Sequence, residues 1–261
     1  AGGWDAADLD LLLVATCTPD MPLPSTACLI QRNLKASRAI AFDLAAACSG
    51  FLYGLSVADL YVRSGTCRKA LVVGTEVMSS VIDWTDRSTC ILFGDGAGAV
   101  LIEPSDDDRG ILSTHLHSDG DLWDLVCVPG GGSRLPASAA MLADRQQFVK
   151  MKGNETFKVA VRTLEATARE ALEANKMGVD DVDLFIPHQA NVRIVDAVME
   201  RLGLRKDRVF LNIDRYGNTS AASIPLALDE AVRAGRVSPG SRILMVAFGS
   251  GLTWASAVVK W

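Results

Sequence analysis

The chain has 261 residues, of which 49% are hydrophobic and 22% charged, so it can bury a sizeable core in one large domain or two fused halves. A net charge of −5 argues against nucleic acid as the main partner, and no apolar run is long enough to cross a membrane. The six cysteines are scattered, with no CxxC pair and no metal-ligand spacing to the three histidines. We therefore expect a cytoplasmic protein with reduced thiols and no metal site.

Strands and helices alternate along the first part of the chain. Leu9 to Thr16 reads as a buried strand, and a helix is expected from about Ser25 to Leu34. A strand from Ile40 to Leu44 then runs into small residues that permit a sharp turn, before a helix from Gly50 to Arg63 and a strand from Lys69 to Gly74. This alternation indicates an α/β layered architecture.

A glycine cluster, Phe93 to Ala99 (FGDGAGA), precedes a strand expected at Val100 to Glu103. A dinucleotide fingerprint requires such glycines between a strand and a helix, and that context is missing here. We interpret the glycines as positions of close backbone packing, where a side chain would clash.

A second series of elements begins at Gly110. It contains a strand from Ile111 to His117, an irregular segment from Asp119 to Gln147 and a strongly amphipathic helix from Asn154 to Asn175. A strand from Val182 to Ile186 ends at the motif PHQAN, and another amphipathic helix follows that motif.

Four short matches relate the two series at offsets of 170 to 175 residues. They pair Asp8–Leu11 with Asp181–Leu184, the strand ending Phe42-Asp43 with one ending Ile213-Asp214, Tyr61–Gly65 with Ala231–Gly235, and Leu71–Gly74 with Val246–Gly249. The sequence therefore predicts a duplicated α/β unit, with one half at residues 1–108 and the other at 109–261.

The duplication suggests where a reactive site would form. Cys48 lies at a helix N-terminus, where free N–H groups and the helix dipole favour the thiolate. His188 ends the second-half counterpart of the strand that ends at Thr16, and Asn218 lies in the counterpart of the Cys48 loop. Each residue alone has a common structural explanation: a buried thiol, a hydrogen-bonded histidine, or an asparagine that tolerates a left-handed turn. If the halves pack around a pseudo-twofold axis, however, all three can converge.

Five motifs in order, AAACSGF, FGDGAGAV, PHQAN, RYGNTSAAS and AFGSGLTWASAVV, closely resemble the β-ketoacyl-acyl carrier protein synthase III enzymes over essentially the whole chain. These are the initiating condensing enzymes of type II fatty acid synthesis. The resemblance implies an α/β thiolase fold, a duplicated five-layer αβαβα architecture, and a homodimer. It also implies a triad of Cys48, His188 and Asn218, whereas the elongating synthases use two histidines.

The resemblance also implies a reaction. Cys48 would take an acyl group from acyl-CoA, with the oxyanion held between the backbone N–H groups of Cys48 and Ser250. Malonyl-acyl carrier protein would then lose CO₂, while neutral His188 and Asn218 stabilise the developing charge. The product would be a 3-ketoacyl-acyl carrier protein, formed without a metal or redox cofactor.

Binding residues follow from the same resemblance, one by one. Arg87 would stack on the adenine of CoA, and Leu23 would close the acyl pocket of the partner subunit. The pantetheine tunnel would be lined by Gly153, Phe157 and Asn191. The acidic carrier protein would dock on Gln189, Ala190, Asn191, Val192 and Arg193, although a solvated helix face explains Arg193 equally simply.

Two other functions remain open at this point: a ketosynthase that primes a polyketide or other specialised pathway, and a non-catalytic partner subunit. The presence of Cys48 argues against the latter. The comparison of the halves further predicts that a strand and a helix precede the first strand in the complete protein. The resemblance implies that roughly 60 residues precede Ala1, a length consistent with such a unit and its loops. A protein starting at Ala1 is then expected to be insoluble or to bind CoA weakly, because one sheet edge is left uncovered.

Overall fold

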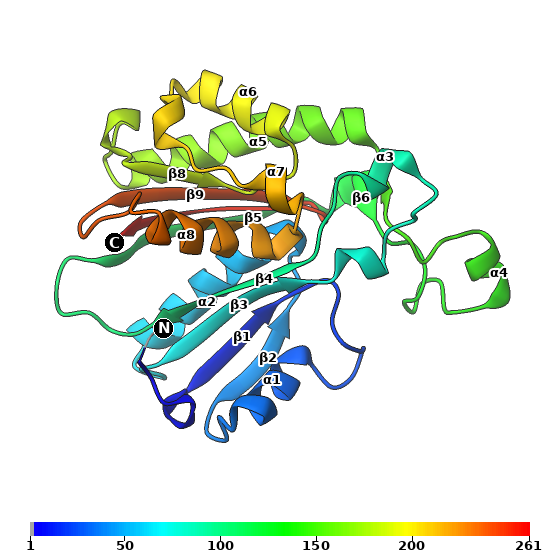
Figure 1. The fold of residues 1–261 in the computed structure, drawn as a ribbon, viewed down its shortest axis with the longest axis horizontal. Coiled ribbons are helices and arrows are strands. Elements are labelled where there is room, and N and C mark those ends of the chain that lie inside the picture. Colours follow the sequence, from blue (N-terminus) through cyan, green and yellow to red (C-terminus); the bar gives the residue numbers. More distant parts are fainter. Residues whose placement is uncertain (1–2) are drawn as a thin grey trace.

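The computed structural model describes residues 3–261, which form five layers of alternating helices and sheets (Figure 1). The first sheet has the strand order β2-β1-β3-β4 and the second the order β5-β10-β9-β8. The thiolase-like α/β architecture expected from the sequence is therefore confirmed.

The first sheet is built from residues 11–102. Its first three strands run parallel, and the fourth is antiparallel to β3. The strands are β1 (Leu11–Ala15), β2 (Ile40–Leu44), β3 (Ala70–Glu76) and β4 (Gly96–Ile102), and the helices are α1 (Thr26–Leu34), α2 (Gly50–Arg63) and α3 (Arg87–Cys90).

The second sheet is built from residues 110–260. Strands β8 and β9 are parallel, while β10 pairs antiparallel with both β9 and β5. The strands are β5 (Gly110–Ser118), β8 (Leu184–Pro187), β9 (Arg242–Gly249) and β10 (Thr253–Lys260), and a separate ribbon holds β6 (Val126–Cys127) and β7 (Lys150–Met151). The helices are α4 (Ala139–Ala143), α5 (Gly153–Ala174), α6 (Val192–Leu202), α7 (Ile213–Tyr216) and α8 (Ser223–Arg233).

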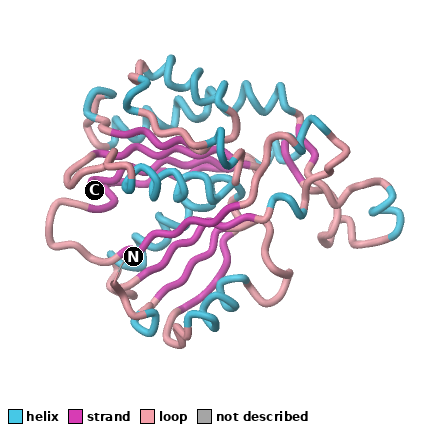
Figure 2. Tube along the Cα trace, viewed as in Figure 1, coloured by secondary structure: helices cyan, strands magenta, loops and turns pink. Residues whose placement is uncertain are grey.

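Helices α2 and α8 form the central layer between the two sheets, which Figure 2 shows as two magenta layers. One apolar core joins them, because Phe51 of α2 and Ile224 of α8 pack with buried side chains of both sheets such as Leu13 and Met245. Separate cores hold α1 on the outside of the first sheet and α5 and α6 on the outside of the second. The site can therefore lie between the halves, on rigid elements.

The glycine cluster confirms the predicted close packing. A Cβ at Gly94 would lie 2.1 Å from the carbonyl oxygen of Tyr216, and one at Gly98 would lie 2.9 Å from the backbone nitrogen of Leu226. Three glycines, Gly94, Gly96 and Gly98, thus let β4 and the loop before it touch the 216–226 segment. The strand begins at Gly96, so part of the cluster lies inside β4 and not ahead of it as predicted.

Two predicted elements differ from the structure. No strand ends at Ile213-Asp214: Val209 makes only an isolated bridge to Phe185, and residues 213–216 form α7. The reason is that the Gln189 side chain accepts the N–H of Asn212 at 2.8 Å, which diverts the chain from the sheet. The irregular segment 119–147 also contains local order, namely a 3-10 turn at Gly120–Leu125, β6 and α4.

The duplication is visible in the turns that lead into the two central helices. Ala47 and Ser220 both have a positive φ, of 46° and 48°, and both begin a 3-10 turn that continues into α2 or α8. Cys48 therefore corresponds to Ala221, in the turn that follows Asn218. Within residues 3–261, β4 has no partner on its second edge, whereas its counterpart β10 pairs there with β5.

Candidate active site

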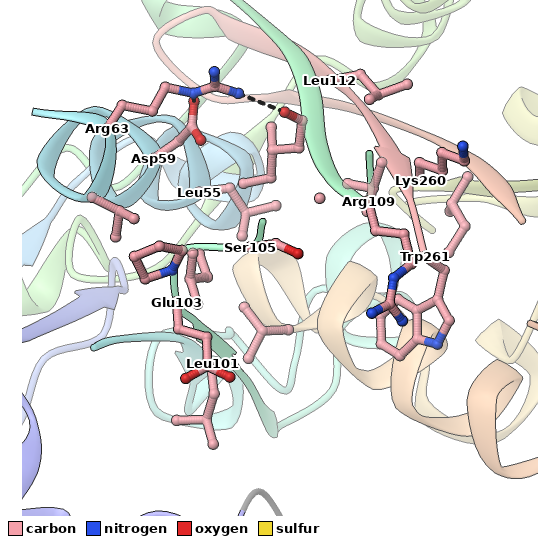
Figure 3. A pocket seen from close by; sticks show the side chains of 18 of the residues that line it. Leu55, Asp59, Arg63, Leu101, Glu103, Ser105, Arg109, Leu112, Lys260 and Trp261 are labelled. Atoms are coloured by element: carbon pink, nitrogen blue, oxygen red, sulfur yellow. Dashed lines mark hydrogen bonds and ion pairs between the residues drawn. The ribbon is translucent and has the colours of Figure 1, made fainter. Parts of the chain in front are cut away.

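Two hollows in the surface differ in chemistry. The larger, about 820 Å³, is an open groove between α2, β4 and the end of β10 (Figure 3). It carries charged side chains such as Arg63, Asp59 and Lys260 but no cysteine or histidine, and it borders the unpaired edge of β4. The smaller, about 280 Å³, is lined mostly by apolar groups together with Cys48, His188 and Asn218. The three predicted residues thus share one pocket.

Cys48 is held in the 3-10 turn that precedes α2, as the sequence predicts. Burial raises the pKa of its thiol to about 11; the nearby Glu76 carboxylate acts in the same direction, and a hydrogen bond with the Ser220 hydroxyl lowers it. This direction is opposite to the one expected from the helix N-terminus alone, because removal from water costs the thiolate more than the backbone N–H groups return. At rest the group is a thiol, and its proton must leave as the sulfur attacks.

His188 follows β8 directly, and only 2% of it is exposed. Its Nδ1 lies 2.7 Å from the Ser223 hydroxyl, while its buried Nε2 has no hydrogen-bond partner within residues 3–261. Burial lowers the pKa of this imidazole to about 4, so the ring is neutral at physiological pH. With Nδ1 accepting the Ser223 hydroxyl proton, Nε2 carries the hydrogen and can donate it to a substrate oxygen.

Asn218 is fixed through both its backbone and its side chain. Its N–H donates to the Leu92 carbonyl at 2.8 Å, and its own carbonyl accepts from Gly94 N at 3.0 Å. The side-chain Oδ1 accepts from Ser220 N at 2.9 Å. Because the amide oxygen is held by the backbone, the NH₂ group is what Asn218 offers to the pocket it lines.

The turn after β9 lies against the Cys48 backbone. A Cβ on Gly249 would lie only 2.6 Å from Cys48 N, so only glycine allows this approach. Ser250 lines the same pocket, and its hydroxyl donates to the Val126 carbonyl. The two backbone N–H groups expected to form an oxyanion hole therefore belong to adjoining segments.

Of the other predicted binding residues, only Ala190 lines this pocket. Gly153 is the exposed first residue of α5, and Phe157 is half-buried under the Arg193 guanidinium, 5.7 Å from its ring centre. Arg87 is exposed at the start of α3, and Leu23 is 84% exposed. Within a single chain Leu23 therefore does not close the acyl pocket.

The segment expected to dock a carrier protein is only partly on the surface. Val192 and Arg193 are exposed, and Asn191 caps α6 by accepting from Arg193 N at 2.9 Å. Gln189, in contrast, is fully buried and bonded to Asn212 N and the Phe210 carbonyl. The prediction that Gln189 contacts a partner protein is wrong, because its side chain is consumed in holding the 210–212 segment.

Three polar residues of the site were missed from sequence. Ser223 contacts the His188 ring, Ser220 holds the Asn218 amide, and Glu76 accepts the Ser220 hydroxyl at 3.0 Å. A glutamate at the end of an otherwise apolar strand was the available signal for Glu76. The serines were hidden in a run of small residues, where sequence does not reveal which hydroxyl turns inward.

Comparison with known proteins identifies relatives over the whole described fold. Residues 42–120 match the family model of 3-oxoacyl-[acyl-carrier-protein] synthase III, and residues 172–261 match that of its C-terminal domain. The chain is 54% identical to β-ketoacyl-[acyl-carrier-protein] synthase III of Roseiflexus castenholzii, with 99% of this chain and 78% of that one aligned. The corresponding protein of Desulfitobacterium hafniense is 52% identical over 97% of this chain and 77% of its own length.

Solved structures agree with the sequence relatives. The 3-oxoacyl-[acyl-carrier-protein] synthase III of Aquifex aeolicus superposes with a TM-score of 0.90 at 47% identity, over 98% of this chain and 79% of that one. A priming β-ketosynthase from the R1128 polyketide pathway gives a TM-score of 0.90 at 40% identity, over 99% and 77%. None of the helices within residues 3–261 has the length and apolar character needed to span a membrane. The chain belongs to the β-ketoacyl-acyl carrier protein synthase III family of condensing enzymes.

Proposed function

We propose that this protein catalyses the initiating condensation of fatty acid synthesis, joining an acyl group from acyl-CoA to malonyl-acyl carrier protein with loss of CO₂. The observation that carries the proposal is the convergence of a thiol, a neutral buried imidazole and a backbone-anchored amide on one apolar pocket. A role in priming a polyketide pathway is less well supported, because the relatives above that are named β-ketoacyl- or 3-oxoacyl-[acyl-carrier-protein] synthase III are more similar to this chain than the priming β-ketosynthase is.

In the first step Cys48 acts as the nucleophile. Its sulfur attacks the acyl-CoA thioester, the backbone N–H groups of Cys48 and Ser250 stabilise the tetrahedral oxyanion, and the C–S bond to CoA breaks. The thiol proton of Cys48 leaves with the CoA sulfur, so free CoA and acyl-Cys48 form together.

In the second step the malonyl carboxylate leaves as CO₂, and its electron pair forms an enolate on the thioester. His188 Nε2–H and the Asn218 NH₂ donate hydrogen bonds to this enolate oxygen, and being neutral they need not give up a proton. The enolate carbon then attacks acyl-Cys48, a C–C bond forms and the C–S bond to Cys48 breaks. The released thiolate takes up a proton from solvent, which restores the resting thiol. No metal or redox cofactor enters the scheme.

The partners in this scheme follow from the family. Arg87 would bind the CoA adenine, Gly153, Phe157 and Asn191 the pantetheine arm, and the exposed Val192 and Arg193 the carrier protein. The apolar and 84% exposed Leu23 supports a homodimer in which its loop closes the partner's pocket. Three further points stay predictions. They are the division into halves at 1–108 and 109–261, a further strand at the β4 edge, and a cytoplasmic location.

Substitution of the three pocket residues should separate the two steps. Cys48→Ala should form no acyl adduct with acyl-CoA, whereas His188→Ala and Asn218→Ala should still be acylated but decarboxylate malonyl-acyl carrier protein about 10²- to 10³-fold more slowly. Intact-protein mass spectrometry and CO₂ release measure the two steps. Cys127→Ala, in the same pocket, is the control and should keep both. A folded Asn218→Ala protein that takes up no acyl group would refute the assignment.

The two pKa shifts predict different pH profiles. Because His188 is neutral above a pKa of about 4, decarboxylation should show no histidine titration between about pH 5 and 9. Because Cys48 has a pKa raised to about 11, its alkylation by iodoacetamide should rise about tenfold per pH unit from pH 7 to 10. Peptide mapping isolates Cys48 from the other thiols. A plateau already reached near neutral pH would show a resting thiolate and contradict the second profile.

Leu23 is expected to set the starter length, because leucine is smaller than phenylalanine and leaves more room in the partner's pocket. Leu23→Phe should reduce turnover of a four- or six-carbon acyl-CoA while leaving that of acetyl-CoA within about threefold. The ratio of kcat/KM values between the starters is the measurement, and the acetyl-CoA value of the same variant is the control. Unchanged or improved use of the longer starters would count against this role.

A further inference from the structure

Glu76 is a buried carboxylate that the reaction scheme leaves without a role. It ends β3, is 2% exposed, and accepts hydrogen bonds from five neutral donors. These are Thr16 Oγ1 (3.3 Å), Cys17 N (3.1 Å), Cys17 Sγ (3.0 Å), Thr18 Oγ1 (2.7 Å) and Ser220 Oγ (3.0 Å). An uncompensated buried charge is costly, so this cluster of donors aimed at one side chain is a built feature of the fold.

The donors are themselves oriented toward the carboxylate. Thr18 Oγ1 accepts from Val77 N at 2.8 Å, and Thr16 Oγ1 accepts from Thr18 N at 3.0 Å. Since each hydroxyl already accepts an N–H, its proton is free to point at Glu76. The carboxylate thus joins the loop after β1 to the turn that follows Asn218.

Ser220 links Glu76 to the reacting groups. Its hydroxyl donates to Glu76 Oε1, and its backbone N–H donates to Asn218 Oδ1 at 2.9 Å. Ser220 has a φ of 48°, a left-handed conformation that is unfavourable for serine and so must be held by its surroundings. Anchoring the hydroxyl fixes the conformation that aims the N–H at Asn218.

We propose that Glu76 is a positioning residue which, through Ser220, holds the Asn218 amide with its NH₂ toward the enolate oxygen. This inference rests on the proposed role of Asn218 in decarboxylation. Glu76 does not line the pocket that holds Cys48 and Asn218. Its effect is on the geometry of a donor that acts in the second step only.

Charge, and not just shape, is required at this position. An ionised carboxylate accepts from all five donors, whereas the isosteric glutamine presents an NH₂ group that can accept from none. The same negative charge disfavours ionisation of the neighbouring Cys48 thiol and raises its pKa. The carboxylate therefore disfavours the Cys48 thiolate while it holds the Asn218 amide. Its removal should slow decarboxylation without slowing acylation.

Glu76→Gln in the full-length enzyme tests these two effects of the carboxylate, on the Asn218 amide and on the Cys48 thiol. CO₂ release from malonyl-acyl carrier protein should fall about 10- to 100-fold, part of what loss of a whole oxyanion donor costs. Alkylation of Cys48 by iodoacetamide at neutral pH should become faster, and acylation by acyl-CoA should not fall. Glu76→Asp, which keeps the charge, should recover part of the decarboxylation rate. A purely structural role predicts that both steps and the melting temperature decline together, and that result would overturn the inference.

A double-mutant cycle with Ser220→Ala tests the route of the effect. If Glu76 acts through the Ser220 hydroxyl, the double variant should decarboxylate no more slowly than the worse single variant. Additive losses would overturn the proposed route. If Glu76→Gln does not fold, Ser220→Ala alone decides, since it breaks the same link and must slow decarboxylation by more than it slows acylation. An equal loss of both steps would overturn the inference.

Asn218→Ala separates this inference from the proposed function. Normal CO₂ release by Asn218→Ala would mean that the proposed function of Asn218 is wrong. Slow release by Asn218→Ala together with normal release by Glu76→Gln would overturn the role of Glu76 alone.

Discussion

The close approach of two duplicated turns at the centre of the molecule is the constraint on which the site depends. The turn before α2 and the turn before α8 touch where a Cβ on Gly50 would lie 3.6 Å from the Cβ of Ala221, and the Ala221 carbonyl leaves no room for a side chain at Gly74. Gly249 packs equally closely on the Cys48 nitrogen. Small residues at these contacts bring Cys48, from one half, into the same pocket as His188 and Asn218, from the other.

The chemistry of the pocket follows from its burial more than from charge. Burial keeps the His188 ring neutral and the Cys48 thiol protonated, so the two groups have no charge of their own at physiological pH. His188 and Asn218 form a pair of neutral hydrogen-bond donors. Such a pair suits a step in which negative charge appears on a substrate oxygen and then leaves it, because preorganised dipoles need not reorganise as the charge develops. The Ser223 hydroxyl contacts the His188 ring. Ser220, whose hydroxyl donates to Glu76, holds the Asn218 amide.

Much of the fold was predictable because the periodicity of hydrophobic residues and the positions of turn-forming residues depend directly on local structure. The strand Ile40–Leu44 and the helix Gly50–Arg63 were predicted with the bounds the structure gives. The expected strand at Ile213 failed because a tertiary contact, Gln189 to Asn212, overrides local pattern. Sequence also brought Cys48, His188 and Asn218 together through the duplication, but not the direction of the Cys48 pKa, which depends on how much water the folded pocket excludes. Residues that act through a second residue, such as Glu76, carry no motif of their own.

We propose that the thiol of Cys48 and two neutral donors, His188 and Asn218, act together in one pocket to make a carbon–carbon bond. The most direct measurement is to supply an acyl-CoA starter and malonyl-acyl carrier protein to the protein and to identify the acyl carrier protein product by mass spectrometry, with CO₂ counted alongside. We expect a 3-ketoacyl-acyl carrier protein two carbons longer than the starter, formed one for one with CO₂. Acyl exchange or CO₂ loss that leaves only acetyl-acyl carrier protein, with no condensed product from any starter, would contradict it.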